Sequence, residues 1–136
     1  MFPGTKNKLI YSELLPLALA NNNDGQGRHW GKSSQVRKSF ERQLRALGFA
    51  RDPFEFQVSV VVTRQLGKGQ RLWDADSVGR GNAKQLIDSL VAVGWFFDDS
   101  PKYIEDCFFT QDSTRRSDGP TTRIDIYADQ RANDAD

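Results

Sequence analysis

Cysteine and long apolar runs are scarce in this chain of 136 residues. Cys107 is the single cysteine, which excludes an internal disulfide and a cysteine-based zinc site and favours a reducing, cytoplasmic setting. No uninterrupted apolar stretch approaches the ~20 residues that a bilayer requires, so we expect no membrane-spanning helix. Glu13 and Pro16 interrupt the apolar patch near the N-terminus, and we expect no secretory signal there.

The remaining composition is that of one globular domain. Hydrophobic residues make up 38% of the chain and charged residues 27%, which excludes intrinsic disorder and a collagen-like chain. We therefore expect a single domain over residues 1–128, followed by a flexible acidic tail at 129–136.

The charges nearly cancel but are unevenly distributed. The first 72 residues contain 12 Lys and Arg against 5 Asp and Glu, whereas the remainder contains 7 against 13. A basic lobe beside an acidic one suits a protein that holds a polyanion with one part and metal cations with the other. The alternative is chance combined with the acidic tail.

Two segments have helical periodicity. The first carries an apolar stripe at helical spacing, formed by Val36, Phe40, Leu44 and Leu47. Ser33 or Ser34 is its expected N-cap, and Gly48 its expected end. The second helix is expected over residues 82–93, ending at Gly94.

Four segments favour β-strands, at residues 9–20, 54–63, 103–110 and 122–127. The second of them alternates apolar and polar residues, which predicts a strand with one buried face. The elements therefore follow the order strand, helix, strand, helix, strand, strand. This order favours a two-layer α/β (α+β) fold, in which a mixed β-sheet has the helices packed on one face.

Four aspartates flanking the second helix are candidate metal ligands. Asp74 and Asp76 are separated by one residue, so in an extended segment both side chains leave the same side of the backbone. Asp98 and Asp99 follow the helix, where the chain can fold back toward the first pair. Close carboxylates oppose each other's ionisation unless a cation neutralises them, and their hard oxygens select Mg²⁺, or alternatively Mn²⁺. For Asp98 and Asp99 the alternative is an ordinary helix-to-strand loop.

Lys84 and Asp88 lie one helical turn apart on the polar side of the same helix. We expect Lys84 to reach a phosphate oxygen or the leaving oxygen, and Asp88 to orient it by a charge-assisted hydrogen bond. The alternative is a surface ion pair worth about 0.3–0.5 kcal/mol.

In combination these residues resemble the signature of the RusA family of Holliday-junction resolvases. The similar run is Asp74-Ala-Asp76, then Lys84-x-x-x-Asp88-x-Leu90, then Gly94 and Asp98-Asp99. The segment RHWGKSSQVRKSFERQL also resembles the entry to the first helix in phage-type members.

The resemblance implies a RusA-like fold and a homodimeric, Mg²⁺-dependent endodeoxyribonuclease that introduces paired nicks into four-way DNA junctions. It matches Asp74, Asp76 and Asp99 to metal-binding catalytic aspartates and Lys84 to the catalytic lysine. Asp98 is a further candidate metal ligand, and Asp88 a supporting residue.

The sequence departs from the family pattern in two places. Ser77 stands where the family often has Asn. The spacing from Asp76 to Lys84 is also about four residues longer than in compact members. A longer loop of this kind costs little additional loop-closure free energy. The second hypothesis is therefore a branched-DNA-binding module with a degenerate, non-catalytic site. A sugar transferase using Asp-x-Asp is a third, but the chain is short for a donor domain and lacks a phosphate-binding glycine fingerprint.

The basic first part of the chain supplies candidate DNA contacts. They are Lys32, Arg37, Lys38, Arg42 and Arg45 around the first helix, and Arg64, Lys68 and Arg71 before Asp74. Contacts of this kind position DNA without reading its sequence, and they make affinity fall with salt. His29, beside Trp30, is a further candidate DNA contact, with local packing as the alternative.

Overall fold

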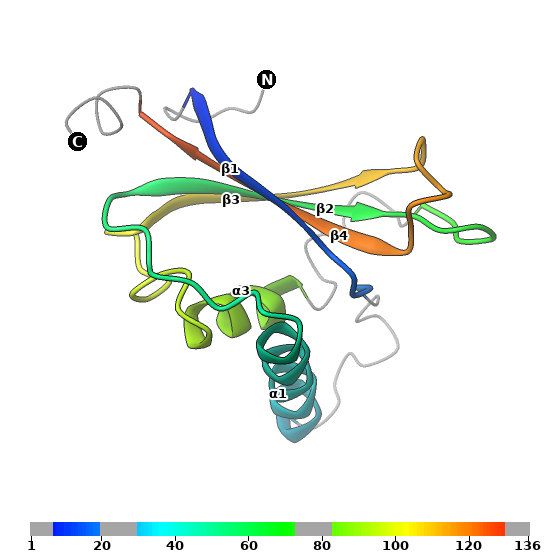
Figure 1. The fold of residues 1–136 in the computed structure, drawn as a ribbon, viewed down its shortest axis with the longest axis horizontal. Coiled ribbons are helices and arrows are strands. Elements are labelled where there is room, and N and C mark those ends of the chain that lie inside the picture. Colours follow the sequence, from blue (N-terminus) through cyan, green and yellow to red (C-terminus); the bar gives the residue numbers. More distant parts are fainter. Residues whose placement is uncertain (1–6, 20–29, 73–82, 130–136) are drawn as a thin grey trace.

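The structure, a computed structural model, describes residues 7–19, 30–72 and 83–129. The elements appear in the expected order: β1 (Lys8–Leu15), α1 (Trp30–Ala46), β2 (Val58–Gln65), α3 (Ala83–Ala92), β3 (Ile104–Asp112) and β4 (Thr121–Ala128) (Figure 1). No helix in this part of the chain is both long and apolar enough to cross a membrane.

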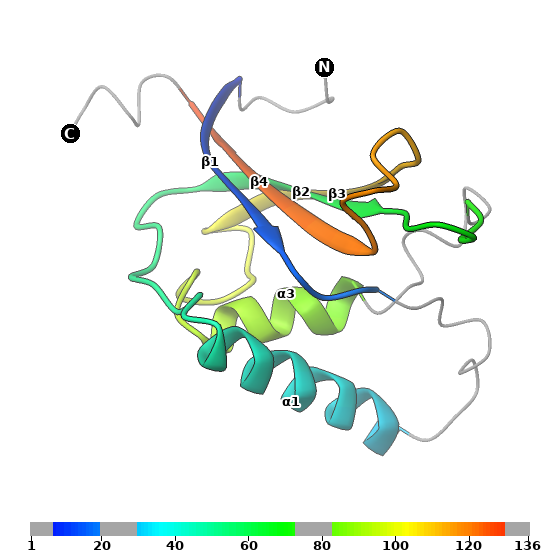
Figure 2. The same ribbon diagram turned by 45° about the vertical axis from the view of Figure 1, so that its right-hand side comes forward.

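The four strands form one mixed sheet in the order β1-β4-β2-β3. β2 pairs with β3 in parallel, while β4 is antiparallel to both of its neighbours. Both helices lie on the same side of this sheet (Figure 2). The predicted two-layer α/β class, with a mixed sheet covered on one face, is therefore confirmed.

The hydrophobic core lies between the sheet and the helices. α1 contributes Phe40 and Leu44, and α3 contributes Leu86 and Leu90, all of them buried. The sheet supplies apolar side chains from its two central strands, which are Val58, Val60, Val62, Ile124 and Ile126. Burial of these stripes against the sheet stabilises both helices, as their periodicity predicts.

Both helices end as predicted, at a glycine with positive φ. Gly48 has φ +80° and Gly94 has φ +101°. In each case the residue after the glycine donates its N–H to a carbonyl five residues earlier: Phe49 to Leu44 at 2.9 Å and Trp95 to Leu90 at 2.9 Å. These are Schellman caps, which satisfy carbonyls that have no partner within the helix.

The expected start of the first helix, at Ser33 or Ser34, is wrong, because α1 already begins at Trp30. Serine inside a helix costs only a few tenths of a kcal/mol, so capping preference does not prevent a longer helix. Leu47, expected in the apolar stripe, is 52% exposed because α1 ends at Ala46 and the chain turns at Gly48. Phe49 packs against the core instead.

Two strand predictions need correction. The first strand ends at Leu15 rather than at residue 20, because Pro16 lacks the N–H that would continue the ladder. The second begins at Val58 rather than at residue 54, and all eight of its residues are buried, not one face only. β2 lies between β4 and β3, so the Val61 side chain on its second face is flanked by Asp125 and Phe108 on the neighbouring strands.

Candidate functional site

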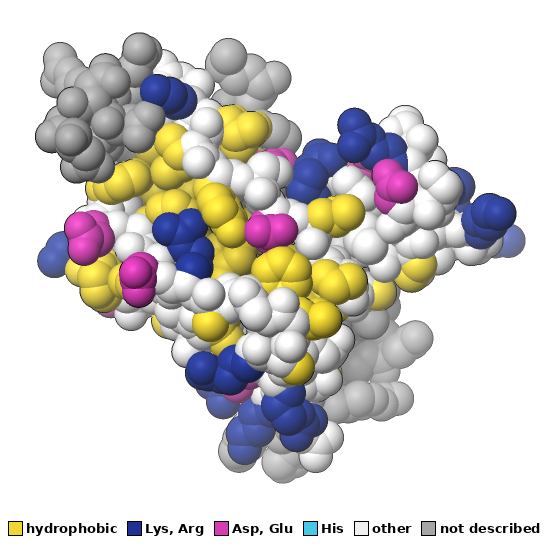
Figure 3. Space-filling model, in the orientation of Figure 1, with side chains coloured by type: hydrophobic (Ala, Val, Ile, Leu, Met, Phe, Trp, Pro, Cys, Tyr) yellow, Lys and Arg dark blue, Asp and Glu magenta, His cyan; other side chains and the backbone are white. Residues whose placement is uncertain are grey.

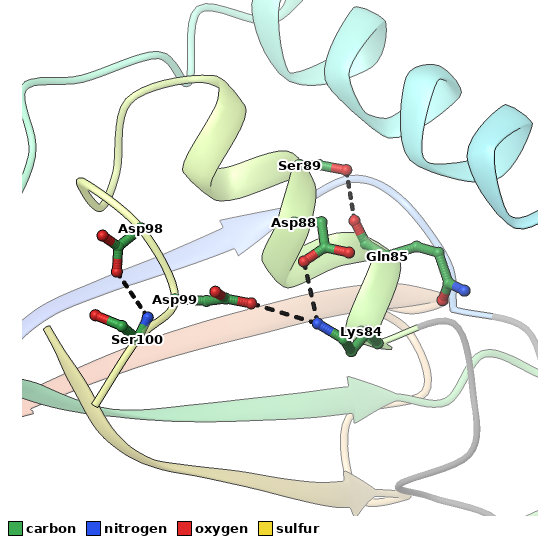
Figure 4. Close-up of polar contacts among 7 residues, drawn as sticks. All are labelled: Lys84, Gln85, Asp88, Ser89, Asp98, Asp99 and Ser100. Carbon is green, nitrogen blue, oxygen red and sulfur yellow. Dashed lines mark hydrogen bonds and ion pairs between the residues drawn. The ribbon is translucent and has the colours of Figure 1, made fainter. Parts of the chain in front are cut away.

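Three of the residues that the sequence analysis grouped around the second helix meet where α3 begins: Lys84, Asp88 and Asp99. Lys84, in the first turn of α3, places its Nζ 3.3 Å from Asp88 Oδ1 and 3.3 Å from Asp99 Oδ2 (Figure 4). Asp99 lies in the loop between α3 and β3, fifteen residues further along the chain. A helix and a loop thus bring two carboxylates to one ammonium group.

The local sequence explains this meeting. Lys84 and Asp88 share one face of α3, while Leu86 and Leu90 anchor another face in the core. After the turn at Gly94, Trp95 and Phe96 are fully buried. Trp95 also donates its Nε1–H to the Phe49 carbonyl at 2.7 Å, which holds the segment leading to the aspartates against the core. The buried aromatic residues therefore position the loop that carries Asp99.

Asp98 lies apart from this cluster. Its Oδ1 accepts the backbone N–H of Ser100 at 2.7 Å, and Figure 4 shows it turned away from Lys84. Hydrogen bonding with Ser100 holds the pKa of Asp98 below its ordinary value. Of the two adjacent aspartates, Asp99 is the one that the described structure brings to Lys84, while Asp98 closes its own loop as an Asx turn.

The cluster is open to solvent. The side chains of Lys84, Asp88 and Asp99 are 69%, 35% and 48% exposed. Burial opposes the charge of Lys84, but hydrogen bonds and charges from Asp88 and then Asp99 outweigh that effect and raise its pKa above the ordinary value. Exposed ion pairs of this kind contribute about 0–1 kcal/mol each to stability. The arrangement therefore contributes little to stability but leaves a cation and two carboxylates accessible to a ligand.

The earlier pair of candidate ligands, Asp74 and Asp76, lies outside the described residues. Within residues 7–19, 30–72 and 83–129, no group of three or more His, Cys, Asp or Glu side chains is placed to hold a metal ion. The donors that are present suit a hard cation, because Asp99 and Asp88 offer carboxylate oxygens. The site around Lys84 is thus compatible with Mg²⁺ but supplies only part of a ligand set.

Cys107 is a near neighbour of this cluster. Burial raises the pKa of its thiol to about 12, and the positive charge of Lys84 offsets that rise only in part. Its side chain packs against the hydrophobic core from β3. A neutral, partly buried thiol behaves as a small apolar side chain in this position.

The basic residues expected to contact DNA fall into two groups in space. On α1, the side chains of Lys38, Arg42 and Arg45 are exposed, and Arg45 also donates from Nη2 to the Ala92 carbonyl at the end of α3. Arg37 is partly buried, and within the described part of the chain its Nε has no hydrogen-bond partner. His29 and the side chain of Lys32 lie outside the described residues.

The second group lies at the end of β2. Lys68 and Arg71 are exposed there, as a phosphate contact requires. Arg64 is only 6% exposed, and its Nη1 donates to the Arg71 carbonyl at 3.0 Å and to Gln111 Oε1 at 2.9 Å. Arg64 therefore supports the loop that carries Arg71 instead of presenting its own charge at the surface.

Sequence reasoning missed two basic residues that the fold brings beside this group. Arg115 and Arg116 belong to the acidic second part of the chain, in the turn between β3 and β4. The local sequence shows only that Arg115 and Arg116 are consecutive in a turn-rich segment. It does not indicate which other loop of the fold lies beside them. The parallel pairing of β2 and β3 decides that, because it places the ends of both strands together.

Comparison with known proteins adds no assignment to these observations. No protein-family model matches the chain, and a search of curated proteins finds no significant match.

Proposed function

We propose that this protein is a Mg²⁺-dependent, structure-selective endodeoxyribonuclease of the RusA type, which resolves four-way DNA junctions by paired nicks. The observation that carries the proposal is the contact of Lys84 with both Asp88 and Asp99. Lys84 and Asp88 are neighbours in any helix, but Asp99 lies fifteen residues beyond Lys84, and a chance likeness of sequence would not require these two to meet in space.

In this proposal Asp99, together with Asp74 and Asp76, would hold Mg²⁺. When bound, the metal supplies an activated water and stabilises the charge that builds on the phosphate oxygens. Lys84 holds a phosphate oxygen or the leaving oxygen with its ammonium group. Asp88 is a positioning residue, because it touches Lys84 at 3.3 Å and orients it toward Asp99.

The charge state of Lys84 fits the role of a fixed cation. Its pKa is raised above the ordinary value of 10.5, so the side chain stays protonated throughout the neutral range. A protonated lysine cannot accept a proton from water. Lys84 therefore acts by electrostatic stabilisation of the phosphate and not as a general base.

The exposed cations of α1 supply a surface for the substrate. Lys38, Arg42 and Arg45 would contact phosphates, which sets the position of the DNA but carries no sequence information. Two copies of the chain related by a two-fold axis would offer two sites to the two strands of a junction. A DNA substrate also agrees with a cytoplasmic setting.

The test is incubation of the purified protein with labelled four-way and linear duplex DNA, with and without Mg²⁺. We expect nicks in the junction only, and only with the metal. Asp99→Asn should abolish nicking with junction binding largely retained, whereas Asp52→Asn, which removes the same charge from an exposed loop residue, should nick normally.

Two results separate the alternatives. Junction binding without product at any Mg²⁺ or Mn²⁺ concentration would assign the protein to the second hypothesis, a non-catalytic branched-DNA-binding module. Full activity of Asp99→Asn or of Asp76→Asn would reject the proposed metal site.

A further inference from the structure

Two loops that are distant in the sequence lie side by side at one end of the sheet. Residues 66–72 follow β2, and residues 113–120 connect β3 to β4. Because β2 and β3 are parallel, Gln65 is paired with Asp112, and the Leu66 N–H donates to the Asp112 carbonyl at 3.0 Å. Figures 1 and 2 both show the loops projecting together beyond the ends of the strands. We call this pair of loops the two-loop lobe.

The two-loop lobe is packed as one unit. Arg116 donates from Nη1 to the carbonyls of Gly67 at 2.8 Å and Gln70 at 2.7 Å, so a side chain of the second loop holds the backbone of the first. Gln70 closes the first loop by accepting the Gly67 N–H at 2.8 Å. The loops approach so closely that a Cβ on Gly67 would lie 2.7 Å from Pro120 Cδ. This packing gives the lobe a defined surface.

That surface is strongly basic. Lys68, Arg71, Arg115 and Arg116 are the cations of the two loops, against the carboxylate of Asp118 and that of Asp112, which adjoins the second loop at the end of β3 near Arg115. Three ion pairs in the described part of the chain are Lys84–Asp88, Lys84–Asp99 and Arg123–Asp125, and none of them involves these four cations. Figure 3 shows Lys and Arg side chains gathered over this end of the molecule, at the right of the view.

A further cation is enclosed beneath the lobe. Burial lowers the pKa of Arg64, and the positive charge of Arg116 lowers it further. Two guanidinium groups within reach of each other repel, which costs electrostatic free energy. A polyanion that approaches the lobe would offset that repulsion with its phosphates.

The lobe also lies on the side of the molecule where α3 begins, in both ribbon views (Figures 1 and 2). That is the end of α3 that carries Lys84, and the first loop continues in the sequence toward Asp74. We propose that the two-loop lobe binds the phosphate backbone of a DNA arm next to the strand that is cut. The inference rests on the proposed nuclease function and adds Arg115 and Arg116 to the substrate surface.

The test uses the double variant K68Q/R115Q. Both side chains are exposed and removing them breaks no hydrogen bond that holds the lobe together. Lys8→Gln, at the end of the sheet opposite the lobe, is the control, since Lys8 pairs with Ala128 whereas the lobe adjoins Thr121. Dissociation constants for a four-way junction and for linear duplex are measured by fluorescence anisotropy without Mg²⁺. The measurements are repeated at several salt concentrations from about 50 to about 300 mM.

We expect K68Q/R115Q to bind both DNA forms about 10-fold more weakly at ~100 mM salt, and the slope of log affinity against log salt to fall by about two. Lys8→Gln should leave both quantities unchanged. Circular dichroism melting curves of the variants should coincide with that of the unmodified protein, since the substitutions lie at the surface.

Failure of this inference differs from failure of the proposed function. If the unmodified protein binds and nicks junctions while K68Q/R115Q keeps its affinity and its salt slope, the lobe is not a DNA contact and the nuclease proposal stands. If the unmodified protein binds no DNA, both proposals fail together.

Discussion

At the scale of single residues, Lys84 links the helix to the loop through Asp88 and Asp99. Its contact with two carboxylates gives it a raised pKa. Because this pKa is raised, the ion pairs of Lys84 stabilise the folded protein fully below the ordinary lysine value of 10.5. That stabilisation is lost only as the pH rises through the folded-state pKa. Lys84 therefore stays protonated throughout the neutral range.

The first prediction concerns this charge. Lys84→Gln should lower the rate of junction nicking about 10²- to 10³-fold, since it removes one charged donor from the phosphate, while junction affinity changes much less. Between pH 7 and 10, the nicking rate of the unmodified protein should not fall through deprotonation of Lys84. Nicking rates measured across that range provide the check. The assignment is contradicted if the nicking rate declines near pH ~8.5 and this decline is absent in Lys84→Gln.

Cys107 gives a second prediction at this scale. Because burial raises its thiol pKa to about 12, the thiolate fraction of Cys107 near pH 8 is far smaller than that of a free cysteine. Alkylation by iodoacetamide, followed by mass spectrometry, should be correspondingly slow in the folded protein and fast in urea. Equal rates in the two conditions would show that the thiol is not buried.

At the scale of elements, both helices end in the same kind of cap, but the two glycines differ in their surroundings. A Cβ on Gly48 would meet open space, whereas a Cβ on Gly94 would collide with the Arg51 carbonyl oxygen. The turn at Gly94 is thus held against the segment that follows α1, and Arg51 donates its N–H to the Val93 carbonyl at 3.4 Å in the same place.

This difference gives a third prediction. Gly48→Ala should lower the free energy of unfolding by about 1 kcal/mol, the cost of a left-handed conformation for a residue with a Cβ. Gly94→Ala should cost about twice as much or more, because the steric clash adds to the same backbone strain. Urea denaturation of both variants measures the difference. Equal losses would mean that the backbone around Arg51 relaxes freely.

Glycine positions and apolar periodicity were enough to predict both helix ends, because a Schellman cap depends on a few neighbouring residues. The extent of β2 was predicted less well. Phe54 and Phe56 continue the apolar alternation of β2 but precede the strand, since the Phe54 N–H bonds to the Trp95 carbonyl at 3.0 Å instead of to a neighbouring strand. That contact joins residues forty-one positions apart, so local alternation carries no sign of it.

At the scale of the whole molecule, one hydrophobic cluster contains side chains from every strand and both helices of the described structure. Leu90 is fully buried at its centre, on the helix that also carries Lys84 and Asp88. The candidate site therefore depends on the same packing that holds the two layers together.

The fourth prediction follows from this shared core. Unfolding should be a single cooperative transition, with coincident midpoints by far-ultraviolet circular dichroism and by tryptophan fluorescence, to which the buried Trp95 contributes. Leu90→Ala should lower the free energy of unfolding by about 2–5 kcal/mol without separating the two midpoints. Two resolved transitions would show that the helices and the sheet unfold independently.

The sequence by itself determined the order of the elements, the faces that the helices bury and the residue types of the candidate site, because periodicity and glycine placement act over a few residues. The tertiary structure decided which side chains meet. It turned Asp99 and not Asp98 toward Lys84, enclosed Arg64, and set Arg115 and Arg116 beside Lys68 and Arg71. Those outcomes depend on strand pairing and on how the layers pack, and such contacts join residues too distant in the chain for any local pattern to record.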